Sequence, residues 1–227
     1  MGLLGGPVAA GGNCSGWWDC MSAPGASTIS SIPNRAGNGD FSGSSNLSTM
    51  LGRRTSKGDG SSIIISATLT TSVAASNRPF TWFVGKLDSL TAGTSAYLCL
   101  PASNAPGQSC TPGREQLSGS TFTAVIVAAD GNDTITTLAR DTNPHLFGAG
   151  VLSTANGRAE VDGVTYDGTH TGLSTNAIDK MHFHAFPGPI NFSTGEVQAA
   201  VLSNTEPDAN IRRAMRDYFR RKNYGLF

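Results

Sequence analysis

The sequence predicts an all-β sandwich that is closed by one C-terminal α-helix. Short runs of β-branched and aromatic residues recur along most of the chain and are separated by turn residues. Charged residues make up only 14% of the 227 residues, and glycine is abundant at 28, which is typical of short strands joined by tight turns. Near the end of the chain, the apolar period changes from that of a strand to that of a helix.

Residues 1–28 are expected to form an extended N-terminal arm. The segment is rich in glycine and carries Trp17, Trp18 and Met21 without a regular period. Large aromatic side chains on an arm would bury a large area against a partner. The alternative is that both tryptophans pack onto their own domain.

The sandwich is expected to occupy residues 29–227. Its most convincing strand is the run at residues 79–87, which is dense in aromatic and branched residues. Hairpin turns are predicted at residues 130–133 and at Asp162-Gly163, because Asp, Asn and Gly tolerate positive φ angles. The remaining strands are predicted at residues 63–73, 96–100, 121–129, 134–138, 145–147, 158–161, 164–166, 180–186 and 196–202.

One amphipathic helix is predicted at residues 205–223. Thr205 is expected to cap it, Asp208 to complete a capping box, and Pro207 to lie in the first turn. The apolar residues that fall on one face at helical spacing are Ile211, Met215, Tyr218 and Phe219. The basic residues at the other positions are Arg212, Arg213, Arg216, Arg220, Arg221 and Lys222. This basic face indicates either a solvated surface or a docking site for an acidic protein, and not a nucleic-acid site, since its aromatics lie on the apolar side.

Four cysteines form two pairs that are close in sequence, Cys14 with Cys20 and Cys99 with Cys110. Neither spacing is that of a zinc motif. A disulfide between Cys99 and Cys110 would close a turn-rich loop and stabilise the fold by about 3 kcal/mol on a chain-entropy argument. Four reduced thiols are the alternative, and only an extracellular end-point would favour disulfides.

Charge and targeting signals limit the expected partners. Basic and acidic residues number 16 each, so the net charge is zero, which gives no long-range attraction to nucleic acid or to an anionic membrane. The first residues carry no Lys or Arg before their short apolar run, so no secretory signal is expected. No apolar run approaches the roughly 20 residues that span a bilayer. A neutral chain also favours self-association.

Several stretches resemble concanavalin A-like, laminin-G-like jelly rolls. Residues 31–40 (SIPNRAGNGD) are similar to the early W-x-N-x-x-G-x-G segment of this family, with Ile-Pro in place of its Trp. The other similar stretches are residues 79–85 (PFTWFVG), 158–164 (RAEVDGV), 195–202 (GEVQAAVL) and 218–226 (YFRRKNYGL). The resemblance implies a concanavalin A-like jelly-roll β-sandwich of two antiparallel sheets, one of them concave. It implies no single function, since this fold hosts lectins, glycosidases, adhesins and virion proteins.

No catalytic site, cofactor or metal is expected. Laminarinase-type glycosidases of this fold carry the pattern E-x-D-x-x-E, with carboxylates about 5 Å apart for retaining hydrolysis, and the sequence lacks this pattern. Glu160 and Asp162 are expected to form a solvent-facing strand end and a hairpin corner. His182 and His184 flank one residue and are expected to point to the same side of their strand. Without a clear third ligand, they indicate a hydrogen-bonding or stacking role on the sheet face rather than a metal site. If that face is concave, as the resemblance implies, the alternative is that they contact a glycan or a protein partner.

The function predicted from these features is that of a structural virion protein of a bacteriophage, above all a capsid decoration (cement) protein. It would be made in the host cytoplasm and bind virion proteins and its own copies. The residues expected to hold these partners are Trp17, Trp18, Arg212, Arg213, Arg216 and Arg220. The alternative is a carbohydrate-binding module or adhesin, such as a phage tail, collar or fibre component that binds host glycans.

Overall fold

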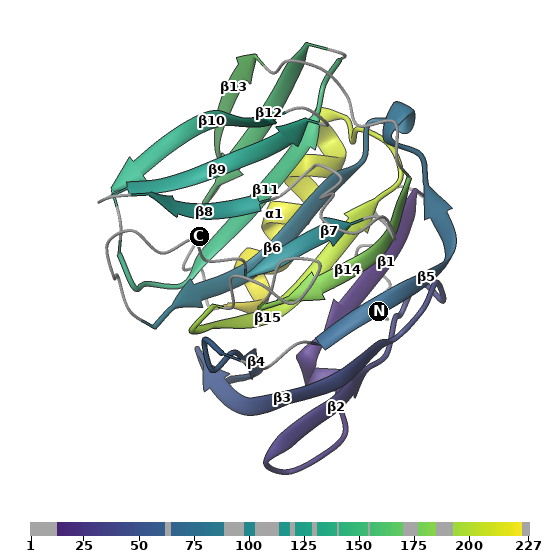
Figure 1. Cartoon of the computed structure of the whole chain (residues 1–227), viewed down its shortest axis with the longest axis vertical. Coiled ribbons are helices and arrows are strands. Elements are labelled where there is room, and N and C mark those ends of the chain that lie inside the picture. Colours follow the sequence, from purple (N-terminus) through teal and green to yellow (C-terminus); the bar gives the residue numbers. More distant parts are fainter. Residues whose placement is uncertain are drawn as a thin grey trace.

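The structure is a computed structural model that describes residues 13–61, 65–88, 98–102, 114–118, 121–128, 131–139, 141–153, 155–169, 177–184 and 193–223. Within these ranges the chain forms antiparallel β-strands and one C-terminal α-helix (Figure 1). This confirms the predicted class, an all-β jelly-roll sandwich with a C-terminal helix.

The larger sheet is built from twelve strands: β1 (Cys14–Asp19), β2 (Thr28–Ile32), β3 (Phe41–Met50), β4 (Arg53–Lys57), β5 (Ile65–Val73), β6 (Phe80–Leu87), β7 (Cys99–Ala102), β11 (His145–Val151), β12 (Asn156–Val161), β13 (Val164–Thr169), β14 (Ile178–Phe183) and β15 (Gly195–Ser203). Their order is β13-β12-β11-β6-β15-β4-β3-β5-β14-β7, with β1 also paired to β15 and β2 to β3. Short 3₁₀ turns lie at Cys20–Ser22 and Ala75–Asn77.

Two further elements cover opposite faces of this sheet. The strands β8 (Arg114–Ser118), β9 (Thr121–Ala128) and β10 (Gly131–Ala139) form a small sheet. This small sheet lies beside β11–β13, whereas the helix α1 (Ala209–Lys222) lies behind these strands (Figure 1). None of the helices in the described residues has the length and hydrophobicity of a membrane-spanning segment.

The main core lies between the two halves of the larger sheet. Phe83 and Phe147, from β6 and β11, stack with ring centroids 4.9 Å apart. In the other half, Phe41 of β3 packs at 4.2 Å from Phe183 of β14, and Trp18 of β1 packs at 5.1 Å from Phe41. These side chains belong to one buried cluster, so the halves of the sheet face each other across an aromatic core. Aromatic residues bury the largest areas, which makes this cluster the main hydrophobic support of the fold.

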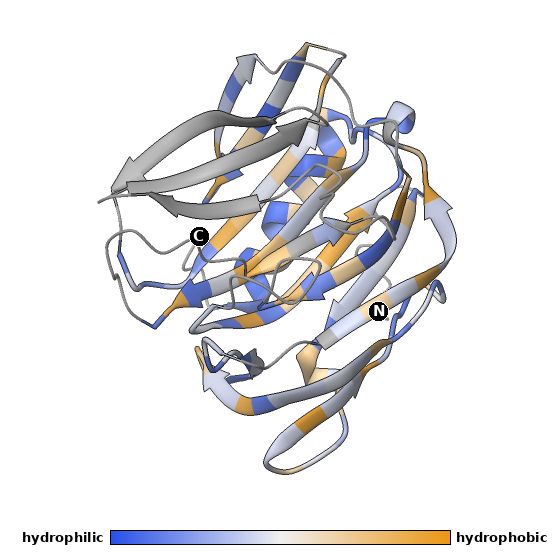
Figure 2. Cartoon of the chain, in the orientation of Figure 1, coloured by the Kyte–Doolittle hydropathy of each residue, from blue (hydrophilic) through white to orange (hydrophobic). Residues whose placement is uncertain are grey.

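A second core lies between the sheet and α1. Because side chains alternate along a strand, β6 turns Phe83 to the main core and Phe80, Trp82 and Val84 to the helix. The helix contributes Met215, Tyr218 and Phe219 from its buried face, with Ile211 partly buried beside them. Figure 2 shows this arrangement as hydrophobic residues on the central strands and mixed hydropathy on α1. The predicted apolar face of the helix is confirmed.

The helix begins later than the sequence predicted. Asp208 is the N-cap residue, and its Oδ1 accepts hydrogen bonds from the backbone N–H groups of Asn210 at 2.8 Å and Ile211 at 2.9 Å. Pro207 therefore precedes the helix, and Thr205 does not cap it. A carboxylate at this position satisfies two of the donors that a helix start leaves unpaired.

Residues 13–28 do not form the expected arm. Strand β1 pairs with β15, placing Trp17 opposite Val201 and Trp18 opposite Ala200. Trp18 is 0% exposed, and its Nε1–H donates to the carbonyl of Gly39 at 2.9 Å. Both tryptophans therefore pack onto their own domain, because there they bury aromatic area that a free arm would leave in water. Residues 1–12 lie outside the described residues.

The cysteines of the described residues are free thiols. Cys14 begins β1 and Cys20 directly follows its end, so a six-residue extended strand separates them by far more than the roughly 7 Å that a disulfide allows. Each thiol donates to a different backbone carbonyl, that of Gly16 and that of Val197. Burial raises the pKa of Cys14 and of Cys20 to about 12. Cys99 is also free and buried, while Cys110 lies outside the described residues.

Candidate functional site

A groove between α1 and the turn that joins β12 to β13 is the candidate site. Its volume is about 410 Å³. Its polar lining consists of Asp162, Arg213, Arg216, Asp217 and Arg220, and its remaining lining consists of Leu146, Gly163 and Val164. We call this feature the α1 groove. It gathers three of the four helix arginines that were predicted to bind a partner, namely Arg213, Arg216 and Arg220.

The β12–β13 turn shapes one wall of the groove. Asp162 and Gly163 have φ angles of 51° and 87°, as a two-residue type I′ hairpin requires, which confirms the predicted turn. This conformation directs the Gly163 carbonyl to the helix, where Nη1 of Arg216 donates to it at 3.1 Å. A Cβ atom at position 163 would lie only 3.2 Å from Cδ of Arg216. Glycine thus permits both the turn and the close approach of the arginine.

Asp162 is held at the base of this wall by His145. Its Oδ2 lies 2.6 Å from Nδ1 of His145, and its Oδ1 accepts the backbone N–H of Leu146 at 2.9 Å. On the other side, Nε2 of His145 lies 2.8 Å from Oδ1 of Asp141. Burial opposes protonation of His145, but the hydrogen bonds to Asp162 and Asp141 outweigh it and raise the pKa to about 9. At neutral pH an imidazolium therefore balances the charge of Asp162.

The three groove arginines carry positive charge that no described carboxylate neutralises through an ion pair. Arg213 and Arg220 are exposed, and Arg213 donates to the side-chain oxygen of Asn210 at 3.0 Å. Arg216 is half-buried against the Gly163 carbonyl. Neutral oxygens thus orient two of these guanidinium groups without cancelling their charge.

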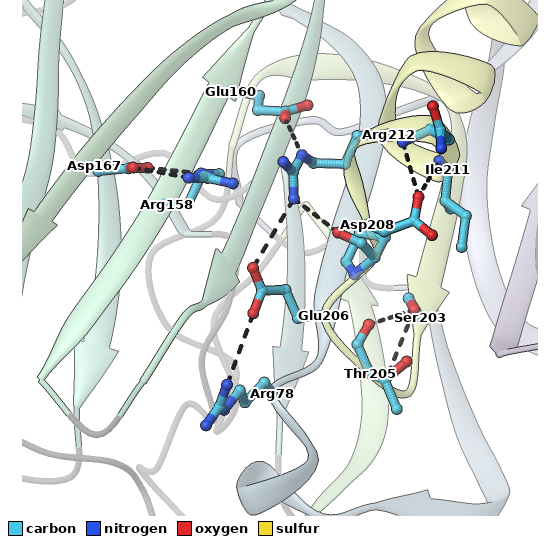
Figure 3. Close-up of polar contacts among 12 residues, drawn as sticks. Arg78, Arg158, Glu160, Asp167, Ser203, Thr205, Glu206, Asp208, Ile211 and Arg212 are labelled. Carbon is cyan, nitrogen blue, oxygen red and sulfur yellow. Dashed lines mark hydrogen bonds and ion pairs between the residues drawn. The ribbon is translucent and has the colours of Figure 1, made fainter.

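Arg212 has a different role from the one predicted, as Figure 3 shows. Its Nε lies 3.3 Å from Oε1 of Glu160 on β12, and its Nη1 lies 3.9 Å from Oε1 of Glu206. Nη1 also donates to the Pro207 carbonyl at 2.7 Å. Glu206 continues the chain of charges to Arg78 at 4.0 Å. These contacts tie the start of the helix to the sheet, so Arg212 is an internal support and not a partner-binding residue.

Glu160 is buried rather than solvent-facing. It is 2% exposed because α1 covers this part of β12. Burial raises the pKa of Glu160 above its ordinary value, and the nearby guanidinium groups of Arg216 and Arg212 act against this rise. Glu160 pairs with Arg212 while Asp162 pairs with His145, so the two carboxylates serve separate structural contacts.

The two histidines of the predicted contact face do not act together. His184 follows β14 with a φ of 66°, which interrupts the alternation of the strand. It is 0% exposed, its Nε2 lies 2.8 Å from Oγ of Ser56, and burial lowers its pKa to about 3. Burial also lowers the pKa of His182 to about 4, and both of its ring nitrogens are buried. The prediction that this pair of histidines contacts a glycan is therefore wrong.

The structure gives no metal site in the ranges that it describes. No group of three His, Cys, Asp or Glu side chains there lies close enough together to hold a metal ion. The groove residues that sequence reasoning missed are Leu146, Asp162, Gly163, Val164 and Asp217. The Asp-Gly turn was visible in the sequence, but its position opposite a helix some 50 residues later was not.

Comparisons with known proteins support the fold. No family model matches the chain, and no curated protein matches it by sequence. A Trypanosoma rangeli sialidase in complex with sialic acid superposes with a TM-score of 0.64 at 15% identity, over 95% of this chain and 34% of the sialidase. The binding domain of Botulinum neurotoxin DC in complex with SialylT superposes with a TM-score of 0.65 at 9% identity, over 91% of this chain and 51% of that domain.

These likenesses support an all-β jelly-roll sandwich fold for this chain. The binding domain of botulinum neurotoxin serotype D/C VPI 5993 gives the same TM-score of 0.65 at 9% identity. This chain spans about a third to a half of the length of these proteins. Identities this low establish a shared fold and nothing finer.

Proposed function

We propose that this chain is a non-catalytic carbohydrate-binding module and that the α1 groove is its glycan site. The observation that carries the proposal is the lining of the groove. Exposed guanidinium groups supply hydrogen-bond donors for sugar oxygens, and Val164, which is 55% exposed, supplies an apolar contact for the C–H face of a sugar ring. A volume of about 410 Å³ lies within the range of small-molecule sites.

The carboxylates at the groove favour binding over bond cleavage. Retaining hydrolysis needs an acid and a nucleophile about 5 Å apart. Asp162 is bound to His145, and Glu160 is buried against Arg212. Among the residues that line the groove, this leaves Asp217 as the carboxylate without an assigned partner.

The structural neighbours support a glycan as the ligand class. One is described in complex with sialic acid and another in complex with SialylT. Each is longer than this chain, so their complexes are support for the proposal and do not locate its site.

A glycan array probed with the purified chain tests the proposal. We expect saturable binding that is lost in the double variant Arg213→Ala/Arg220→Ala. The control Arg221→Ala removes the same charge from the same helix outside the groove lining and is expected to bind like the unaltered chain. Absence of binding to every glycan would refute the proposed function.

A structural role in a virion, predicted from the sequence, is the second candidate. It is favoured by the exposed arginines of α1 and by the zero net charge. Trp17 and Trp18 no longer support it, since they pack within the domain. Light scattering of the full chain tests this candidate. A defined oligomer that dissociates in the variant Arg213→Ala/Arg220→Ala would support it, whereas a full chain that is monomeric would contradict it.

A further inference from the structure

We infer that the α1 groove recognises a carboxylate, so that the glycan it binds is an acidic one. This inference rests on the proposed function and adds the chemical class of the ligand. It follows from the charge, the spacing and the orientation of the groove arginines.

The charge of the groove is unbalanced toward the cationic side. Three guanidinium groups line it together with two carboxylates. Asp162 already receives hydrogen bonds from His145 and from a backbone N–H. The buried Glu160 interacts electrostatically with Arg216, but Glu160 forms its ion pair with Arg212. Asp217 is therefore the one lining carboxylate left to face three cations, which favours an anionic ligand.

The spacing of the arginines aligns their side chains along the groove. Arg213, Arg216 and Arg220 are three and four residues apart, which places them on one helix face in successive turns. A guanidinium group is a planar fork that matches the two oxygens of a carboxylate. A ligand lying along the groove can thus meet one fork with its carboxylate and the others with its hydroxyl oxygens.

Arg216 is the pre-oriented member of the set. Its Nη1 is fixed by the Gly163 carbonyl, while Nε and Nη2 make no further hydrogen bond to the described residues. Because Arg216 is half-buried, its charge is screened less than that of Arg213 or Arg220. An anion held there gains a charge-assisted hydrogen bond with little loss of side-chain freedom.

The apolar side of the groove argues for a sugar acid over a free inorganic anion. Val164 is exposed on the turn and lies in the same groove as the arginines. Phosphate would use the arginines alone and leave this apolar contact unmade. A sugar acid presents an anionic group and an apolar ring face together, so it satisfies both parts of the lining.

Calorimetric titration of the full chain at low salt tests the inference with sialyllactose, its carboxyl methyl ester and lactose. We expect sialyllactose to bind about 10- to 100-fold more tightly than the ester or lactose, the range of a hydrogen bond to a charged group. Arg216→Lys keeps the charge but loses the fork, and should lose most of this preference. Arg221→Ala should keep it, and circular dichroism should show that both variants remain folded.

The outcomes separate the two proposals. Equal binding of sialyllactose and its ester would overturn the carboxylate inference and leave glycan binding intact. Binding of none of the three probes would overturn the carboxylate inference, and the proposed function would fall with it only if the glycan array also showed no binding. Inorganic phosphate is a fourth probe: we expect it to bind at least about tenfold more weakly than sialyllactose, and equal affinity would mean that the groove holds an anion without recognising a sugar.

Discussion

Arg212 and Arg213 are neighbours in the sequence but face different surroundings. Arg212 points to the sheet, where the buried Glu160 lies opposite, and its side chain is only 15% exposed. Arg213 is exposed in the α1 groove and makes no ion pair with a described carboxylate. The basic residues of one helix therefore do not all serve the same purpose. A buried carboxylate on the adjoining strand determines which arginine holds the fold and which remains available to a ligand.

Among the substitutions considered, loss of Arg212 should reduce stability most. Arg212→Ala would leave Glu160 buried without its partner and should lower the free energy of unfolding by about 3 kcal/mol. Breaking a buried ion pair costs about 3 to 5 kcal/mol, and we expect the lower value because Arg158 and Arg216 remain near Glu160. Urea denaturation measures it. The double variant Glu160→Leu/Arg212→Met removes both charges and should recover most of the lost stability. If Arg212→Ala destabilised the chain as little as Arg213→Ala does, the proposed difference between the two arginines would be wrong.

A smaller loss of stability is expected when His145, at the base of the groove wall, loses its proton. The pKa of His145 is raised from 6.5 to about 9, so its contribution to stability is fully present below pH 6.5 and is lost as the pH rises through 9. Asp141 is 41% exposed, and after allowance for solvent screening we expect a contribution of about 1 to 2 kcal/mol. The measurement is the difference in unfolding free energy between the unaltered chain and His145→Gln at pH 6.5, 8 and 10. A difference that does not shrink across this range contradicts the pairing.

The N-cap of α1 should contribute about as much to the free energy of unfolding as the His145 pairing, or slightly less. Asp208→Ala removes the acceptor of two backbone N–H groups and should cost about 1 kcal/mol. Thr205→Ala serves as the control and should change stability by less than about 0.5 kcal/mol. A larger loss from Thr205→Ala than from Asp208→Ala, measured by thermal unfolding, would favour the cap expected from the sequence over the one observed.

The smallest effect on stability is expected in the groove itself. Arg213→Ala/Arg220→Ala removes exposed side chains and should change the unfolding free energy by no more than about 0.5 kcal/mol. The same variant should lose glycan binding, so stability and affinity should separate on this side of the helix. A stability loss comparable to that of Arg212→Ala would show that these arginines support the fold instead.

The sequence predicted those parts of the molecule that depend on local patterns. Strand β6 was recognisable from its dense aromatic and branched residues, and the turn at Asp162-Gly163 from the φ angles that these residues tolerate. The apolar face of α1 followed from its helical period.

The remaining features depend on contacts between segments that are distant in the sequence. The pairing of Trp17 and Trp18 with β15 joins residues more than 180 positions apart, so no local pattern distinguished a strand from an arm. His184 appeared to continue the alternation of β14, but its positive φ is set by its tertiary surroundings. The groove was not predictable for the same reason, because the sheet topology alone brings α1 to the β12–β13 turn.

A crystal structure of the chain grown with sialyllactose would test the glycan site at the α1 groove. We expect the sugar to occupy the α1 groove, with its carboxylate within hydrogen-bond distance of Arg213, Arg216 or Arg220 and a ring face against Val164. A sugar bound elsewhere on the sandwich, with the groove empty, would contradict the assignment of the site.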